Sequence, residues 1–192
     1  MKIYDISQEV FSCTVYPGDP KPEKQILSST SAGALYNLTA FSMCAHNGTH
    51  IDAPFHFLGE GKTVEQLDLS IFVGECYVAR HEGDVTGADA AAILKKAGDA
   101  ARILIGGPAI VTAEVAAVFA ASGIKLIGNE SQTIGPENAP MAVHKVLLAK
   151  EIVLLEGIVL ADVPEGKYFL NAAPLNFAGF DGAPCRAYLI EE

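Results

Sequence analysis

Residues 101–128 read ARILIGGPAIVTAEVAAVFAASGIKLIG, and this stretch decides the fold class. Two short apolar runs, 101–107 and 124–128, flank a helical segment with Thr112 as candidate N-cap and Gly123 as its stop. Strands that alternate with helices in this way indicate an α/β unit.

The alternation extends to both sides of this stretch. A helix is predicted over 86–98, where Thr86 and Asp89 have the spacing of a capping box, and another over 140–150. The rest of the chain is β-prone, with strands expected over 1–7, 35–46 (running into the segment 46–56), 74–80, 151–163 (one or two strands) and 185–190, and a loop over 15–24. We therefore predict a mixed α/β fold in a single domain over 1–192.

Composition excludes several classes of function. The net charge of −10 argues against nucleic acid as a partner, because phosphate binding requires clustered Lys and Arg. No segment approaches the length of a membrane span, and no basic amphipathic stretch suggests a membrane surface. The N-terminus lacks the apolar run of a secretory signal, and the four cysteines are scattered without a CxxC, so a cytoplasmic protein with reduced thiols is expected.

Chemistry-bearing residues concentrate in HNGTHIDAPFH, residues 46–56, which holds three of the five histidines. Gly48 and Pro54 oppose a helix here, so an extended or turning segment is expected. In an extended segment His50 and Asp52 point to the same side and can present an imidazole and a carboxylate to one cation. His56 can return toward the same pocket beyond Pro54.

These nitrogen and oxygen donors suit Zn²⁺, Mn²⁺ or Fe²⁺. Structural zinc sites usually contain cysteines, and no suitably spaced pair occurs, so an open catalytic site is favoured over a structural one. A polar hydrogen-bonded loop and coincidence remain the alternatives. Downstream, His144 lies in a predicted helix and Glu156 ends a buried apolar run, where a carboxylate is costly unless paired or ligated. From spacing alone, the simpler interpretation is a solvent-facing His144 and a Glu156 that enters the turn before Gly157.

At this point the chain resembles the cyclase-like metal-dependent hydrolases, which include bacterial kynurenine formamidase and isatin hydrolase. Residues 46–56 match their signature HxGTHxDAPxH. The segments VYPGDP (15–20), GIKLIGNES (123–131) and APLNFAGFDGAPCRA (173–187) resemble further family segments in the same order.

The resemblance implies a swivelling β/β/α fold and two metal ions, usually zinc and in some members manganese. By motif, the metal ligands would be His46, His50, Asp52, His144 and Glu156, with Asp52 a natural bridge, and His56 would serve in acid–base catalysis. It also implies a homodimer or homotetramer, in which aromatics near the N-terminal loop complete a neighbour's pocket. Phe11 and Tyr16 are the candidates by position.

Two departures from the family pattern stand out. Asn129-Glu130 replaces a common Asp-Thr pair, which affects contacts around the ligands or the substrate but not the ligands themselves. The chain has no Trp, whereas kynurenine formamidases often place one beside the Pro-Gly-Asp loop, so N-formylkynurenine is less strongly indicated as the substrate.

The function expected is hydrolysis of a small amide, formamide or cyclic amide by a metal-activated water, with His56 as proton shuttle. One alternative is a cyclase or dehydratase-like reaction that uses the same ions as Lewis acids. The other is a non-catalytic, metal-stabilised module that binds small molecules.

Overall fold

The computed structural model describes residues 1–191 and is organised around one nine-stranded sheet, with strand order β1-β13-β11-β5-β7-β9-β10-β4-β12. The strands are β1 (Lys2–Asp5), β4 (His50–Asp52), β5 (Val73–Arg80), β7 (Arg102–Gly106), β9 (Leu126–Asn129), β10 (Val153–Glu156), β11 (Gly166–Asn171), β12 (Gly182–Pro184) and β13 (Tyr188–Glu191). The helices are α1 (Gly87–Ala97), α2 (Ala113–Ala120) and α3 (Met141–Leu148). Short 3-10 turns occupy Val10–Ser12, Thr30–Ala32, Pro54–His56, Val64–Gln66 and Leu69–Ile71.

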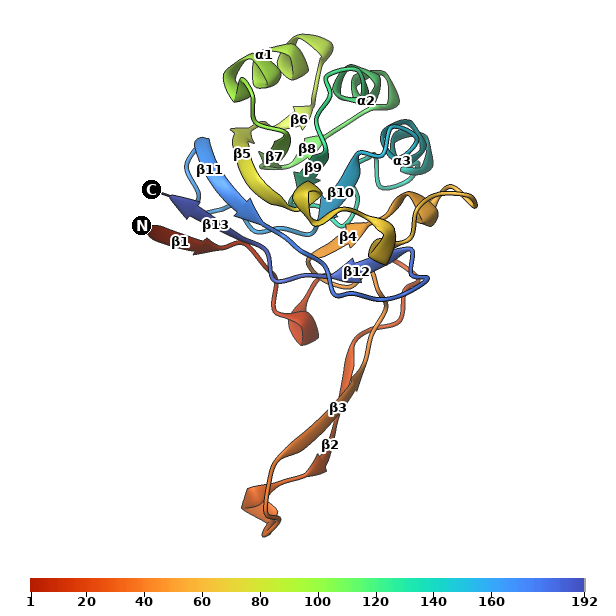
Figure 1. Ribbon diagram of the computed structural model, residues 1–192, viewed down its shortest axis with the longest axis vertical. Coiled ribbons are helices and arrows are strands. Elements are labelled where there is room, and N and C mark those ends of the chain that lie inside the picture. The colour runs from red at the N-terminus through yellow and green to blue at the C-terminus, as the bar shows by residue number, and fades with distance from the viewer. Residues whose placement is uncertain (192) are drawn as a thin grey trace.

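The centre of the sheet is parallel: β5, β7, β9 and β10 are neighbours in that order, with α1, α2 and α3 as the crossovers. All three helices lie on one face (Figure 1). The predicted α/β unit of residues 101–128 is thus confirmed, and β7 is apolar over 103–105 because both its faces are buried. Ile103 and Ile105 pack toward the helices, whereas Leu104 packs into the second core on the other face.

Local sequence signals account for the helices. Thr86 and Asp89 form the predicted capping box of α1, with each side chain accepting a hydrogen bond from the other residue's backbone N–H. Thr112 caps α2, accepting from the Val115 N–H. Pro140 precedes α3 directly, where its missing N–H costs nothing.

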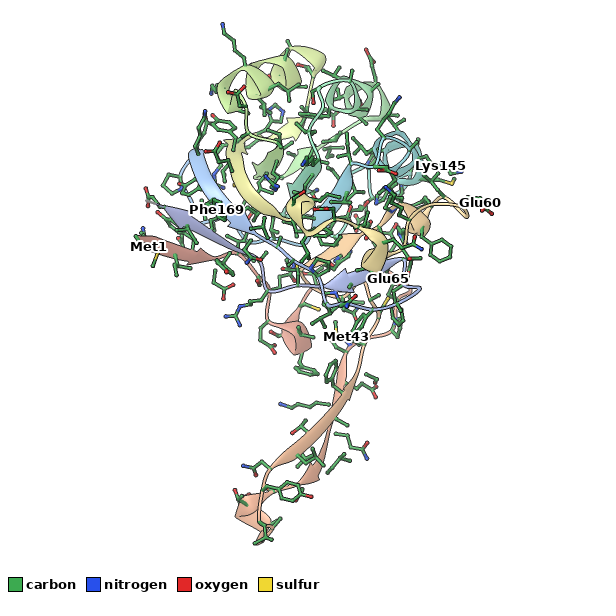
Figure 2. All side chains as sticks on the ribbon, viewed as in Figure 1. Met1, Met43, Glu60, Glu65, Lys145 and Phe169 are labelled. Carbon is green, nitrogen blue, oxygen red and sulfur yellow. The ribbon has the colours of Figure 1, made fainter. Side chains whose placement is uncertain are left out.

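A second region projects from this body. β2 (Glu23–Ser28) and β3 (Leu38–Ser42) form an isolated antiparallel hairpin. We call residues 21–42 the arm; it extends away from the sheet in Figure 1. Its side chains reach outward on both sides in Figure 2, below Met43, where the arm joins the body. Two further strands of two residues each, β6 (Gly83–Asp84) and β8 (Ala109–Ile110), pair in parallel near the helices.

The prediction of one strand over 35–46 that runs into the metal-site segment is wrong. β3 ends at Ser42, and a turn follows in which the Asn47 side-chain oxygen accepts a hydrogen bond from the Cys44 N–H. Gly48 then adopts a positive φ of 66°, which an extended strand does not allow. Over 151–163 there is one strand, β10, which ends at Glu156 because Gly157 also takes a positive φ.

Among residues 1–191, no helix is both long and apolar enough to span a bilayer.

Candidate metal centre

Strand β4 carries the centre of the site and lies between β10 and β12. The register places Glu156 opposite His50 and Gly182 opposite Asp52. Ile51 points into the second core, so alternation puts His50 and Asp52 together on the other face, as the sequence predicted. α3 brings His144 to the same place, and all four polar side chains are at most 3% exposed.

His50 and His144 are each fixed through one ring nitrogen. His50 Nδ1 lies 2.9 Å from the carbonyl oxygen of Gly48, and His144 Nδ1 lies 3.0 Å from that of Pro140. A carbonyl oxygen only accepts, so Nδ1 carries the proton in both rings and Nε2 is available as a ligand. Histidine ligands of metals are commonly fixed in this way.

Both Nε2 atoms face the carboxylates of Asp52 and Glu156. His144 Nε2 lies 3.3 Å from Asp52 Oδ2 and 3.2 Å from Glu156 Oε1. His50 Nε2 lies 3.4 Å from Asp52 Oδ1 and 3.7 Å from Glu156 Oε2. Glu156 Oε1 also accepts a hydrogen bond from the Ile134 N–H at 2.8 Å, which orients the carboxylate.

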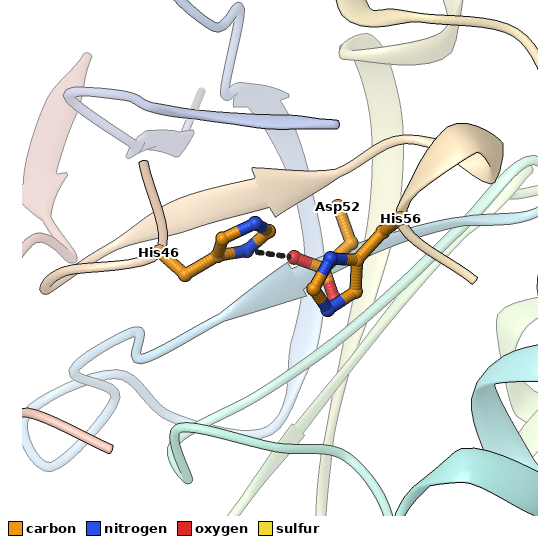
Figure 3. Close-up of side chains that lie close together, drawn as sticks. All are labelled: His46, Asp52 and His56. Carbon is orange, nitrogen blue, oxygen red and sulfur yellow. Dashed lines mark hydrogen bonds and ion pairs between the residues drawn. The ribbon is translucent and has the colours of Figure 1, made fainter. Parts of the chain in front are cut away.

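A second group shares Asp52. His46, from the turn before β4, and His56, from the turn after it, approach the same carboxylate (Figure 3), and ligand atoms of the three residues lie within 4.8 Å of one another. His46 Nδ1 is 2.8 Å from Asp52 Oδ1. The structure therefore brings together all six residues singled out at 46–56, 144 and 156. Asp52 is common to both groups, consistent with its predicted place as a bridge.

Sequence reasoning missed one member of the site. Asp181 Oδ2 lies 2.8 Å from His46 Nε2 and 2.9 Å from His56 Nδ1. The sequence does contain a feature that marks this residue: Asp181 is the single charged residue in AAPLNFAGFDGAPC, residues 172–185.

The charges are strongly coupled. Burial lowers the pKa of His46, but hydrogen bonds to Asp181 and Asp52 outweigh it and raise that pKa to about 11. Burial likewise lowers the pKa of His144, while Asp52 and Glu156 raise it to about 10. Burial alone would raise the pKa of Asp52, yet hydrogen bonds from His144, His46 and His50 hold it well below its usual range. Positive charge next to the buried carboxylates, supplied by protons on the imidazoles or by metal ions, therefore stabilises them.

The donor set fits divalent cations. Two ligands that each lie about 2.0–2.1 Å from a tetrahedral ion are about 3.3 Å apart, close to the separations of His144 Nε2 from the two carboxylates. Unprotonated Nε2 atoms that face carboxylate oxygens repel them unless a proton or a cation lies between. Nitrogen and oxygen donors without thiolate suit Zn²⁺ or Mn²⁺.

The remaining predicted residues lie outside this centre. Phe11 lines a cavity of about 700 Å³ at the base of the arm, together with Phe41 and Met43. The Tyr16 hydroxyl donates to the carbonyl oxygen of Glu137 at 2.9 Å. Their assignment to substrate binding therefore stays a prediction.

Asn129 and Glu130, the departure from the family pattern, hold loops together. Glu130 accepts hydrogen bonds from the Gly107 and Leu160 N–H groups, and the Asn129 amide donates to the Thr133 carbonyl. Neither side chain belongs to the candidate metal groups.

Fold and site together define a class: mixed α/β proteins with a histidine–carboxylate centre suited to divalent cations. The chain belongs to the family described as "Putative cyclase", whose model matches residues 4–136, so the predicted family is confirmed.

Relatives agree over the whole length. The chain is 33% identical to a kynurenine formamidase of Erythrobacter litoralis (strain HTCC2594) over 204 residues, which cover 99% of this chain and 94% of the relative. It is similar to the structure of a predicted metal-dependent hydrolase from Bacillus stearothermophilus (TM-score 0.81, 27% identity, 98% and 97% of the two chains). Isatin hydrolase A from Labrenzia aggregata has the same fold (TM-score 0.84, 19% identity, 98% and 93% coverage), which confirms the predicted fold class.

Proposed function

We propose that the chain is a metal-dependent hydrolase that cleaves the C–N bond of a small amide, formamide or cyclic amide. The observation that carries the proposal is the convergence of three imidazoles and the buried Glu156 carboxylate around Asp52, with two Nε2 atoms facing the carboxylates. The 33% identical kynurenine formamidase supports this reaction class.

His46, His50, Asp52, His144 and Glu156 would hold the ions, two per subunit, with zinc the first choice and manganese the second. Bound divalent cations of this kind lower the pKa of water and polarise a carbonyl group. Burial of the carboxylates favours occupancy, because an unpaired buried charge is costly.

His56 would move the proton. It is the most accessible of the four imidazoles of the centre: its side chain is 25% exposed, against 14% for His46 and at most 3% for His50 and His144. Its ring accepts the proton that water loses as the oxygen attacks the carbonyl carbon. The same ring returns a proton to the nitrogen as the C–N bond breaks, which yields a carboxylic acid and an amine. Histidine is the side chain most often used for such proton transfers near neutral pH.

The experiment is metal analysis of the purified protein, followed by turnover of N-formylkynurenine, isatin and simple cyclic amides with added Zn²⁺ or Mn²⁺. We expect bound metal, turnover of at least one amide, loss with a chelator, and recovery with metal. Incorporation of ¹⁸O from labelled water separates hydrolysis from the cyclase or dehydratase alternative. Bound metal without turnover across the panel would favour the binding module and overturn the proposal.

A His56→Gln variant tests the shuttle. We expect full metal content and a rate at least about 100-fold lower. Unchanged turnover would remove His56 from the mechanism.

We also propose that the protein is a homodimer or homotetramer in which the arm contacts a second copy. Six large apolar side chains of the arm are 46–97% exposed, namely Ile26, Leu27, Leu35, Tyr36, Leu38 and Phe41. An isolated two-stranded hairpin is marginally stable in water, so a partner surface would stabilise it. The arm carries two lysines and one glutamate in a chain of net charge −10, so it complements the acidic body of another copy.

A small-molecule substrate remains the predicted partner, and the cytoplasm the predicted location. Light scattering on the eluting protein tests the oligomer, since a monomer at micromolar concentration would contradict it.

A further inference from the structure

Two imidazoles of the centre share one carboxylate oxygen that belongs to neither candidate metal group. Asp181 Oδ2 contacts His46 Nε2 at 2.8 Å and His56 Nδ1 at 2.9 Å, and the two rings lie 4.1 Å apart between centroids. Asp181 is 39% exposed, against 1% for Asp52, so it lies at the rim of the centre.

The backbone holds Asp181 in place from both sides. Its carbonyl oxygen accepts a hydrogen bond from the Ala53 N–H at 2.9 Å, and that of Phe180 accepts from the Val64 N–H at 3.0 Å. Strand pairing then places Gly182 opposite Asp52.

The next residue makes room for the first imidazole. A Cβ on Gly182 would lie 2.5 Å from His46 Cε1 and 2.8 Å from the Ile51 carbonyl oxygen, so a side chain would push the ring away. Asp181 and Gly182 therefore act as a pair, in which one residue holds a ring nitrogen and the other leaves space for the ring.

We infer that Asp181 is a positioning residue that fixes the tautomer of His56, with the proton on Nδ1 and the lone pair on Nε2. This rests on the proposed function, because the role matters only if His56 moves a proton. A carboxylate only accepts, so the neutral imidazole must donate Nδ1–H to it. The nitrogen left for the shuttled proton is Nε2. Asp181 Oδ2 also accepts from His46 Nε2. It thereby orients the His46 ring, a candidate metal ligand, with its Nδ1 toward Asp52.

The test compares Asp181→Asn with Asp162→Asn, which removes the same charge from an exposed position. In Asp181→Asn, the amide oxygen can still accept a hydrogen bond, but the negative charge that favours Nδ1–H is lost. We expect kcat to fall about 10–100-fold, with KM and metal content nearly unchanged. The Asp162→Asn variant should match wild type. Unchanged kcat in Asp181→Asn would overturn the inference.

A second readout does not need turnover. With only five histidines, ¹⁵N-histidine labelling of the zinc-loaded protein resolves the ring nitrogens, and His56→Gln assigns the signals of His56. We expect a protonated Nδ1 and an unprotonated Nε2 in wild type, and loss of this preference in Asp181→Asn. An Nε2–H tautomer in wild type would overturn the inference even if the variant fails to fold. Absence of turnover in wild type with the expected tautomer would contradict the proposed function and leave the assignment of Asp181 standing.

Discussion

The body and the arm differ both in strand pairing, parallel at the centre of the body and antiparallel in the arm, and in what covers the strands. β7, β9 and β10 are buried at every residue, between the helices on one face and the second core on the other. No residue of β2 or β3 is buried. The strands of the body are thus stabilised by side chains packed on both faces of the sheet, whereas the arm has little packing within the described chain to stabilise it. The difference teaches that the site and the arm can be perturbed separately.

The largest effect is expected in the buried metal centre of the body. Asp52→Ala removes the carboxylate common to both metal groups and leaves three imidazoles without their shared partner. We expect bound metal to fall by at least half and turnover to fall below about one-thousandth of wild type. Metal analysis and the amide assay measure both effects. Retained metal and activity would show that Asp52 is not a ligand.

A matched pair of core and arm variants sharpens the contrast in folding stability. Phe119 on α2 is 0% exposed, whereas Phe41 on β3 is 62% exposed. Phe119→Ala should lower the free energy of unfolding by about 3–5 kcal/mol because it leaves a cavity. Phe41→Ala should change it by about 0.5 kcal/mol or less in the isolated subunit. Urea denaturation at low protein concentration measures both, and equal losses would show that the arm is part of the folding core.

The arm variants test the contact with a second copy. The register pairs Lys24 with Phe41 and Ile26 with Thr39, so Ile26 and Phe41 share one face, whereas Gln25 lies on the other. Ile26→Asp with Phe41→Asp should weaken self-association at least about 10-fold, because charge replaces apolar contact area. Gln25→Asp is the matched control. Sedimentation analysis reads the outcome, and an unchanged oligomer would place the interface elsewhere.

The smallest effect concerns a surface ion pair of the body. Asp5 accepts hydrogen bonds from the Arg186 guanidinium, which lowers the pKa of the carboxyl group. A depressed pKa contributes stability above the carboxyl's unfolded-state pKa, and this contribution is lost as the pH falls through the folded value. Asp5→Asn should therefore cost less than about 1 kcal/mol at neutral pH, and the difference from wild type should shrink in acid. Thermal denaturation at pH 7 and pH 3 checks the sign.

Local signals were sufficient where one segment determines its own structure. The capping box at Thr86 and the buried run over 101–107 predicted α1 and β7 because they depend on neighbours in sequence. The arm was missed because alternation does not reveal what will cover a strand, and an exposed hairpin has the same pattern as a buried one. His144 and Glu156 were predicted as ligands from the family resemblance rather than from spacing. Asp181 was missed because only strand pairing brings it to His46, 135 positions earlier.

The position of β12 near the end of the sequence determines when Asp181 can join the site during synthesis of the chain. Among residues 1–191, β12 pairs with β4 alone, and Asp181 directly precedes it. The ribosome must therefore translate past residue 181 before the two imidazoles can meet their carboxylate. A stalled polypeptide that ends before this codon would therefore hold His46 and His56 without the carboxylate that contacts both rings.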